Sequence, residues 1–398
     1  MLELLRDRVY IRYWLAVVAS FLGDAMAKVT LVYLVARASG SPLVISLVVL
    51  LQLLPSGVLG AFVGPLADRL PKRALLVWAD LARVPIVLAM IPFLDSVPML
   101  LALTLLEGLG KAFFETARIA AVPAIVGRHN LASAVALFQS TNQALAMAGP
   151  VLAGVLVAAG SVPVVLVVNT ATFAVSALLL GSLAVLREQP PAGGAAEPYW
   201  TALRTGVREI LKVPSLRFLL AFLVPVMLVF GLFSTNVHAQ LLTVFGLPAF
   251  EYGLAQAVLA AGSIGGALLG PVLLRRRPTG LLLASVASFG VVLVALPPVA
   301  GMFAIMAWCL LAGLATGLFQ VPIANTLLRD LPEDLRGRGV GLLNTVIVNV
   351  TLVGVFAGGV GASLAGVTAS LVAAGVVLVA SAGAAAWASG GRVAGRVL

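Results

Sequence analysis

Seven charged residues lie inside long apolar stretches of the first half of the chain, where a charge is costly unless it has a function. They are Asp24, Lys28, Asp80, Arg83, Glu107, Lys111 and Glu115. Removing a carboxylate from water favours its protonated form, whereas a neighbouring lysine favours the ionised form. A carboxyl group balanced between these two influences can take up and release a proton.

The spacing of two pairs puts both of their charges on one helical face. Asp24 and Lys28 are four residues apart, as are Glu107 and Lys111, and residues i and i+4 are neighbours on a helix. Each pair can be a balanced ion pair that holds helices together, or a proton-binding group with its partner. We rank Glu107 first and Asp24 second as proton-binding residues, with Glu115 as a further candidate.

The second half of the chain has polar and aromatic residues, but no charges, deep in its apolar stretches. Amide and aromatic side chains suit a large, weakly polar ligand better than a sugar or a multiply charged metabolite. The residues that we expect to line such a binding cavity are Asn236, Gln256, Gln320, Asn325, Phe233 and Phe319.

The sequence gives little support to catalysis. It has two His residues and one Cys, Cys309, and so lacks a Ser/His/Asp set, a metal-binding cluster and a disulfide. We expect no enzyme activity, no metal and no cofactor.

The composition identifies the medium around the chain. Of the 398 residues, 61% are hydrophobic and 10% are charged, whereas soluble domains have about 25% charged residues. Apolar runs of about 20 residues match a hydrocarbon core about 30 Å thick. These runs are apolar throughout and do not alternate as barrel strands do. The sequence therefore predicts an all-α polytopic membrane protein.

Gly, Pro and charged residues divide the apolar runs into twelve expected transmembrane helices. We place them at about 11–36, 43–67, 74–93, 98–117, 134–159 and 163–186, and at about 216–241, 252–274, 279–297, 302–327, 339–362 and 366–388. The expected domains are a six-helix bundle over 1–186, a cytoplasmic linker over 187–215, and a second six-helix bundle over 216–398. The linker combines a Pro/Gly-rich segment with either an amphipathic helix or a solvated connector.

The basic residues orient these helices. With the N-terminus in the cytoplasm, 21 of the 25 Lys and Arg residues fall on the cytoplasmic side and only Arg37 falls on the other. This asymmetry follows the positive-inside rule and predicts that both termini are cytoplasmic. The formal charge of +10 is therefore a topology signal, and we expect no nucleic-acid partner.

The two halves repeat one another at an offset of about 205 residues, which is typical of transporters with a site between repeats. Gly64-Pro65 and the basic turn after it recur as Gly270-Pro271 followed by three arginines. Shared packing of small residues between membrane helices gives a second explanation.

One loop carries a family resemblance. The segment from Gly64 to Arg73, GPLADRLPKR, resembles the signature loop of the major facilitator superfamily, with Pro71 in place of the usual second Gly. The resemblance implies that Asp68, Arg69 and Arg73 control the switch between outward-facing and inward-facing states. Asp80 and Arg83 are expected to brace this loop.

Two further motifs point to a branch of that family. Gly149, Pro150 and Gly154 are similar to the motif of its antiporters, although a generic kink with close packing also explains them. FLGD ending at Asp24 and FFETAR ending at Arg118 look like the branch of macrolide-efflux and enterobactin-exporter proteins. The sequence departs from the superfamily at Thr104, where an arginine is usual, so a mechanism that needs that arginine is not expected.

The resemblance implies a secondary transporter of the major facilitator fold in the inner membrane of a prokaryote. We expect proton-coupled export of an amphipathic small molecule, such as a drug, a macrolide-like compound or a siderophore. The alternatives are lysophospholipid or lipid transport, or uptake by the same fold. The expected partners are that small molecule and the lipid bilayer, and we expect a monomer.

Overall fold

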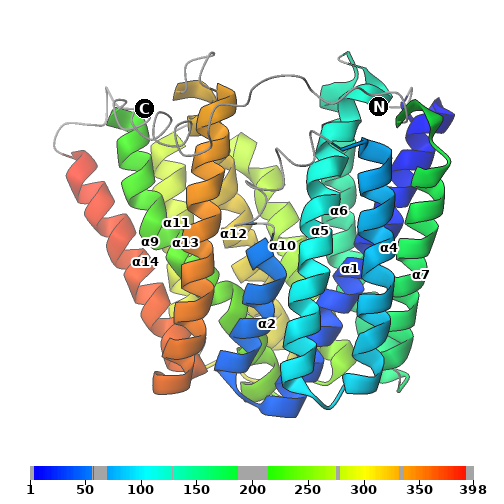
Figure 1. Ribbon diagram of the computed structural model, residues 1–398. Helices are drawn as coiled ribbons and strands as arrows, with labels where there is room; N and C mark the ends of the chain where they lie inside the picture. Colours follow the sequence, from blue (N-terminus) through cyan, green and yellow to red (C-terminus); the bar gives the residue numbers. More distant parts are fainter. Residues whose placement is uncertain are drawn as a thin grey trace. The chain divides into compact units, whose positions relative to one another are not determined.

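The structure, a computed structural model, describes residues 4–55, 57, 70–127, 129–160, 162–186, 214–274, 278–330 and 336–390. Its secondary structure in these ranges is helical (Figure 1). Ten of the helices in this part of the chain are long and apolar enough to cross a membrane. The shorter apolar helices Pro42–Leu54 and Gly280–Val294 bring the number to the twelve expected spans. The prediction of an all-α, twelve-helix membrane protein is confirmed.

The first half supplies six of these helices, coloured from blue to green in Figure 1. They are α1 (Arg8–Ser39), α2 (Pro42–Leu54), α4 (Lys72–Met90), α5 (Val97–Val126), α6 (Leu131–Ala158) and α7 (Val162–Gly181). Helix α5 is longer than the expected 98–117. It ends at Val126 and is followed by the cap residue Gly127, whose φ of 67° suits glycine. Arg118 is consequently part of a helix and is not a loop residue.

The second half supplies the other six. They are α9 (Pro214–Ala239), α10 (Ala249–Leu274), α11 (Pro278–Val294), α12 (Met302–Asp330), α13 (Arg336–Ala365) and α14 (Val367–Gly390). A short π-helical segment, Gln240–Val244, follows α9. All six agree with the expected spans to within a few residues.

The described helices form two compact units that nearly follow the halves of the chain. The first unit contains 1–40 and 47–196 together with 247–254 at the start of α10, and the second contains 41–46 with 197–246 and 255–398. The expected linker over 187–215 lies almost wholly outside the described residues. The domain limits of 186 and 216 therefore stay predictions.

Small residues determine how closely the helices of the first unit approach. Helix α1 packs mainly on α7 and α6, and α4 packs on α5 and α7. Gly23 of α1 lies directly against Asn169 and Thr172 of α7, and a methyl group on Gly23 would overlap Thr172 Oγ1 and Asn169 Oδ1. This contact holds the part of α1 that carries Asp24 close to α7.

We expect Gly23→Ala to lower the stability of the protein by about 1–3 kcal/mol, because overpacking forces neighbouring helices apart. The matched control is Gly181→Ala in α7, where the nearest neighbour of the new methyl group is Val77 Cγ2 at 4.0 Å. Thermal unfolding in detergent measures both changes. Equal melting temperatures for the two variants would contradict the packing described for Gly23.

Candidate functional site

A buried arginine from α4 joins the acidic residues of three helices. The Arg83 guanidinium forms ion pairs with Asp24 of α1 and Glu107 of α5, and it lies 3.4 Å from Asp80 Oδ1 on its own helix. Its Nε donates to Glu107 Oε1 at 2.9 Å. The Arg83 side chain is fully buried. We call Asp24, Asp80, Arg83, Glu107 and Lys111 the Arg83 cluster, because Lys111 Nζ lies 3.1 Å from Asp24 Oδ2.

The neighbours of Arg83 leave its guanidinium little freedom. A Cβ on Gly110 would lie 2.6 Å from Arg83 Cγ, so a glycine at this position makes room for the arginine stem. The guanidinium carbon lies 3.9 Å from the centre of the Phe173 ring, a favourable cation–π distance. These contacts from α5 and α7 aim the charged end of Arg83 at the carboxylates.

Asp80 forms the innermost part of the cluster and is fully buried. Ser20 Oγ donates to Asp80 Oδ1 at 3.2 Å, and Arg83 Nη1 lies 3.5 Å from the same hydroxyl. Buried charges are retained when they are paired and hydrogen-bonded. Asp80 and Arg83 therefore belong to the same charged site as Asp24 and Glu107.

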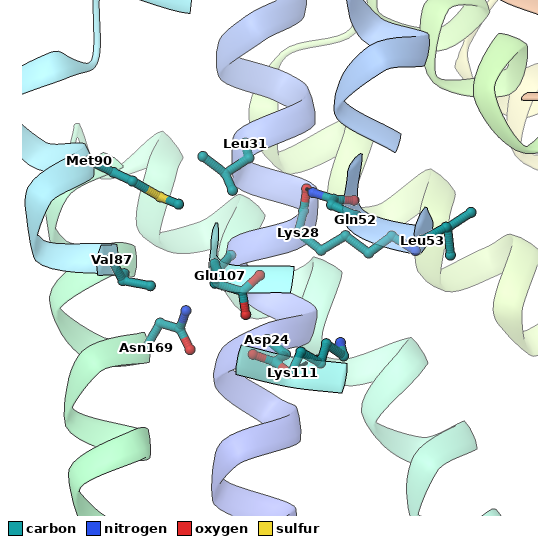
Figure 2. Close-up of a pocket in the computed structure, with 11 residues that line it drawn as sticks. Asp24, Lys28, Leu31, Gln52, Leu53, Val87, Met90, Glu107, Lys111 and Asn169 are labelled. Carbon is teal, nitrogen blue, oxygen red and sulfur yellow. Dashed lines mark hydrogen bonds and ion pairs between the residues drawn. The ribbon is translucent and has the colours of Figure 1, made fainter. Parts of the chain in front are cut away.

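A cavity of about 120 Å³ lies beside the cluster, within the first unit. Figure 2 shows the side chains that line it, from α1, α2, α4, α5 and α7. The lining residues are Asp24, Ala27, Lys28, Leu31, Gln52, Leu53, Val87, Met90, Glu107, Lys111 and Asn169. Pockets for drug-sized ligands are larger, about 300–1,000 Å³, so this cavity accommodates a part of such a ligand.

The ion pairs cross between helices and do not follow the i,i+4 spacing within one helix. Asp24 pairs with Arg83 and Lys111, while Lys28, four residues later, has no ion pair with a described side chain. Glu107 likewise pairs with Arg83 and not with Lys111. The described contacts therefore do not include the pairs Asp24/Lys28 and Glu107/Lys111, and the proton-binding role of these residues stays a prediction.

Glu115 has a different partner from the rest of the predicted set. Its Oε2 lies 2.6 Å from Arg118 Nη2, and Arg118 in turn stacks on Phe138 at 3.8 Å and on Phe21 at 5.3 Å. Tyr13 donates a hydrogen bond to the Arg118 carbonyl. Glu115 thus belongs to a separate contact between α1, α5 and α6, and we exclude it from the Arg83 cluster.

The guanidinium beside Glu107 is the feature that sequence reasoning missed. Thr104 occupies the usual arginine position of this helix, and its hydroxyl donates to the Leu100 carbonyl one turn earlier. Arg83 of α4 supplies the contact to Glu107 instead. The expectation that Asp80 and Arg83 brace the signature loop stays a prediction, because Gly64, Asp68 and Arg69 are outside the described residues. Arg73 is partly buried in the first turn of α4.

Three of the expected cavity residues of the second half are buried in the packed interior of their unit. Phe233 packs against Phe289 and Trp308, and Phe319 packs against Phe230 and Phe289. Asn236 is also fully buried. Their expected role in lining a substrate-binding cavity stays a prediction.

The remaining polar candidates have different surroundings. Asn236 Nδ2 donates to Ser370 Oγ at 3.1 Å, and Gln256 Nε2 lies 3.0 Å from His238 Nδ1. Gln320 is exposed. The side chain of Asn325 is outside the described part of the chain.

The glycines of the antiporter-type motif lie at close helix contacts. Gly149 faces Ala25 of α1. A Cβ on Gly154 would lie 2.8 Å from the Ala249 carbonyl oxygen, at the start of α10 that belongs to the same unit. Pro150 lies inside α6. Close packing accounts for this geometry, so the motif carries no separate evidence for the direction of transport.

Comparison with known proteins identifies the family of the chain. The model of the Major Facilitator Superfamily matches residues 13–354. The chain belongs to the Major Facilitator Superfamily. This places it among membrane transporters, which are not an enzyme class, and confirms the family resemblance of its signature loop.

Relatives within the superfamily include exporters. The chain is 25% identical to the MFS-type transporter YfiS of Bacillus subtilis over 86% of this chain and 84% of that protein. It is 21% identical to macrolide efflux protein A of Streptococcus pyogenes, over 87% and 89%. It is 31% identical to the enterobactin exporter EntS of Citrobacter koseri, over 67% and 64%.

Solved superfamily structures share the fold. A bacterial homologue of the iron transporter ferroportin superposes with a TM-score of 0.73 at 17% identity, covering 94% of this chain and 98% of that one. The nucleoside transporter NupG gives a TM-score of 0.73 at 13% identity, covering 95% and 98%. At these identities the similarity establishes the fold alone.

Proposed function

We propose that this superfamily member exports an amphipathic small molecule in exchange for protons. The observation that carries the proposal is the Arg83 cluster, in which Asp24 and Glu107 meet one arginine beside a cavity inside apolar helices. Charges at such depth are expensive and mark ion or substrate pathways. The similarity to macrolide and enterobactin exporters supports the direction of transport.

Proton exchange needs a group whose charge changes while the substrate is bound or released. The carboxyl groups of Asp24 and Glu107 line the cavity together with Lys28 and Lys111, so a change in their charge acts directly on a ligand there. The apolar lining by Leu31, Leu53 and Met90 matches the apolar part of an amphipathic ligand. In a prokaryote, a protein of this kind would reside in the inner membrane with both termini in the cytoplasm.

Transport by proteoliposomes with an acidic interior tests this proposal. Purified protein is reconstituted, and a panel of labelled drugs, macrolides, siderophores and lysophospholipids is offered outside. A pH difference of one unit should support about tenfold accumulation for an exchange of one proton per substrate. Accumulation that requires an acidic exterior would instead indicate uptake by cotransport, and accumulation of lysophospholipids alone would indicate a lipid transporter.

A further inference from the structure

Lys28 is the charged residue of the cavity that stands apart from the Arg83 cluster. Its side chain is exposed to the cavity and forms no ion pair with the described carboxylates. Figure 2 shows it directed toward Gln52 and Leu53, away from Glu107. Asp24, one helical turn earlier, is engaged by Arg83 and Lys111.

The elements around this part of α1 offer Lys28 few charged neighbours. The described residues of α2, α6 and α7 include no ionisable side chain. Helix α5 contributes Glu107 and Lys111 to the cavity. Helix α4 contributes Asp80 and Arg83, which are fully buried.

The start of α10, which belongs to the same unit, contributes two further ionisable groups. Tyr252 stacks on Tyr33, beyond Lys28 along α1, with ring centroids 6.3 Å apart, and Glu251 precedes it in the chain. Among the charged residues that line the cavity, Lys28 therefore has the fewest contacts with groups of opposite charge.

Among the described residues, the charges of the Arg83 cluster and of the cavity beside it leave room for one further cation. The three carboxylates of Asp24, Asp80 and Glu107 are contacted by two cations, Arg83 and Lys111. One negative charge is thus left over when Lys28 is not counted. A proton on Lys28 balances this charge, and so does a positively charged ligand in the cavity.

We propose that Lys28 carries the exchanged proton and that the substrate is an amphipathic monovalent cation. When the cation enters, it repels the ammonium charge; an N–H bond at Lys28 Nζ breaks, its electrons stay as the lone pair, and the proton passes to water. When the cation leaves on the other side, Lys28 takes a proton from water there. One proton is exchanged for one substrate. This mechanism rests on the proposed function and names its substrate class.

Binding of tetraphenylphosphonium to the purified full-length protein tests the proposal, with tetraphenylborate as an anion of matched shape. Because one proton and the cation compete, the wild-type Kd for the phosphonium should fall about tenfold for each unit by which the pH is raised, until Lys28 is neutral. In Lys28→Met the Kd should be low and independent of pH. In Lys28→Arg it should be high at every pH, since a guanidinium does not release its proton. Calorimetry measures all three.

A control separates this mechanism from other roles of the residue. Arg37→Met changes an exposed cation at the end of α1, outside the cavity, and should bind as the wild type does. Preference for the borate anion, absence of phosphonium binding, or a pH-dependent Kd in Lys28→Met would overturn the proposal. If the wild type shows no gradient-driven transport in proteoliposomes, the proposed function is overturned instead. Failure of the Lys28 mechanism and failure of the proposed function are therefore distinguishable.

Discussion

Glu107→Gln is expected to reduce proton-driven transport to the level of protein-free liposomes. Glutamine keeps the size of the side chain and an acceptor for the Arg83 Nε hydrogen bond, but it carries no negative charge. The cavity then lacks the charge that attracts either a proton or a cationic substrate. Asp24→Asn should have the same effect, because Asp24 contacts both Arg83 and Lys111. Accumulation of labelled substrate in proteoliposomes under a pH gradient measures the loss.

The control for these variants is Asp95→Asn, at an exposed position before α5, which should transport as the wild type does. Helical content and elution as a single species show whether each variant is folded. Normal gradient-driven transport by both Glu107→Gln and Asp24→Asn would remove the Arg83 cluster from the coupling mechanism.

Arg83→Met is expected to destabilise the protein by about 3–5 kcal/mol, the cost of breaking a buried ion pair from one side. The substitution leaves the carboxylates of Asp24, Asp80 and Glu107 without their shared cation and removes the guanidinium from the Phe173 ring. Thermal unfolding in detergent measures the change.

Arg83→Lys separates charge from geometry. A lysine keeps the positive charge but lacks the planar fork that reaches several carboxylates at once, so its stability should fall between those of the wild type and Arg83→Met. A melting temperature of Arg83→Met equal to that of the wild type would contradict the central structural role of Arg83.

The sequence predicted the fold well because lipid imposes a length and an apolar character on every span. Runs such as 302–327 and 366–388 correspond closely to α12 and α14. The end of α5 was misplaced, because the charge of Arg118 suggested a loop. In the structure Arg118 stacks on Phe138 and the helix continues to Val126.

The site was harder to predict, because spacing along one helix does not determine which helix faces which. The sequence shows that Asp24 and Glu107 lie deep in the membrane, but not that α4 turns Arg83 between them. Gly110 was the available signal, since a small residue opposite a long side chain permits its approach. The sequence also does not show that Phe233 and Phe319 pack against other aromatic rings of their unit, because a core position and a cavity wall have the same composition.

The most direct test of proton exchange is to measure the internal pH of proteoliposomes after substrate is added outside. Proteoliposomes that contain a pH-sensitive dye and start without a pH gradient are given external substrate. Exchange predicts that the interior becomes more alkaline as substrate enters, with no change in Glu107→Gln. An interior that becomes more acidic, or one whose pH stays constant while substrate accumulates, would contradict proton exchange.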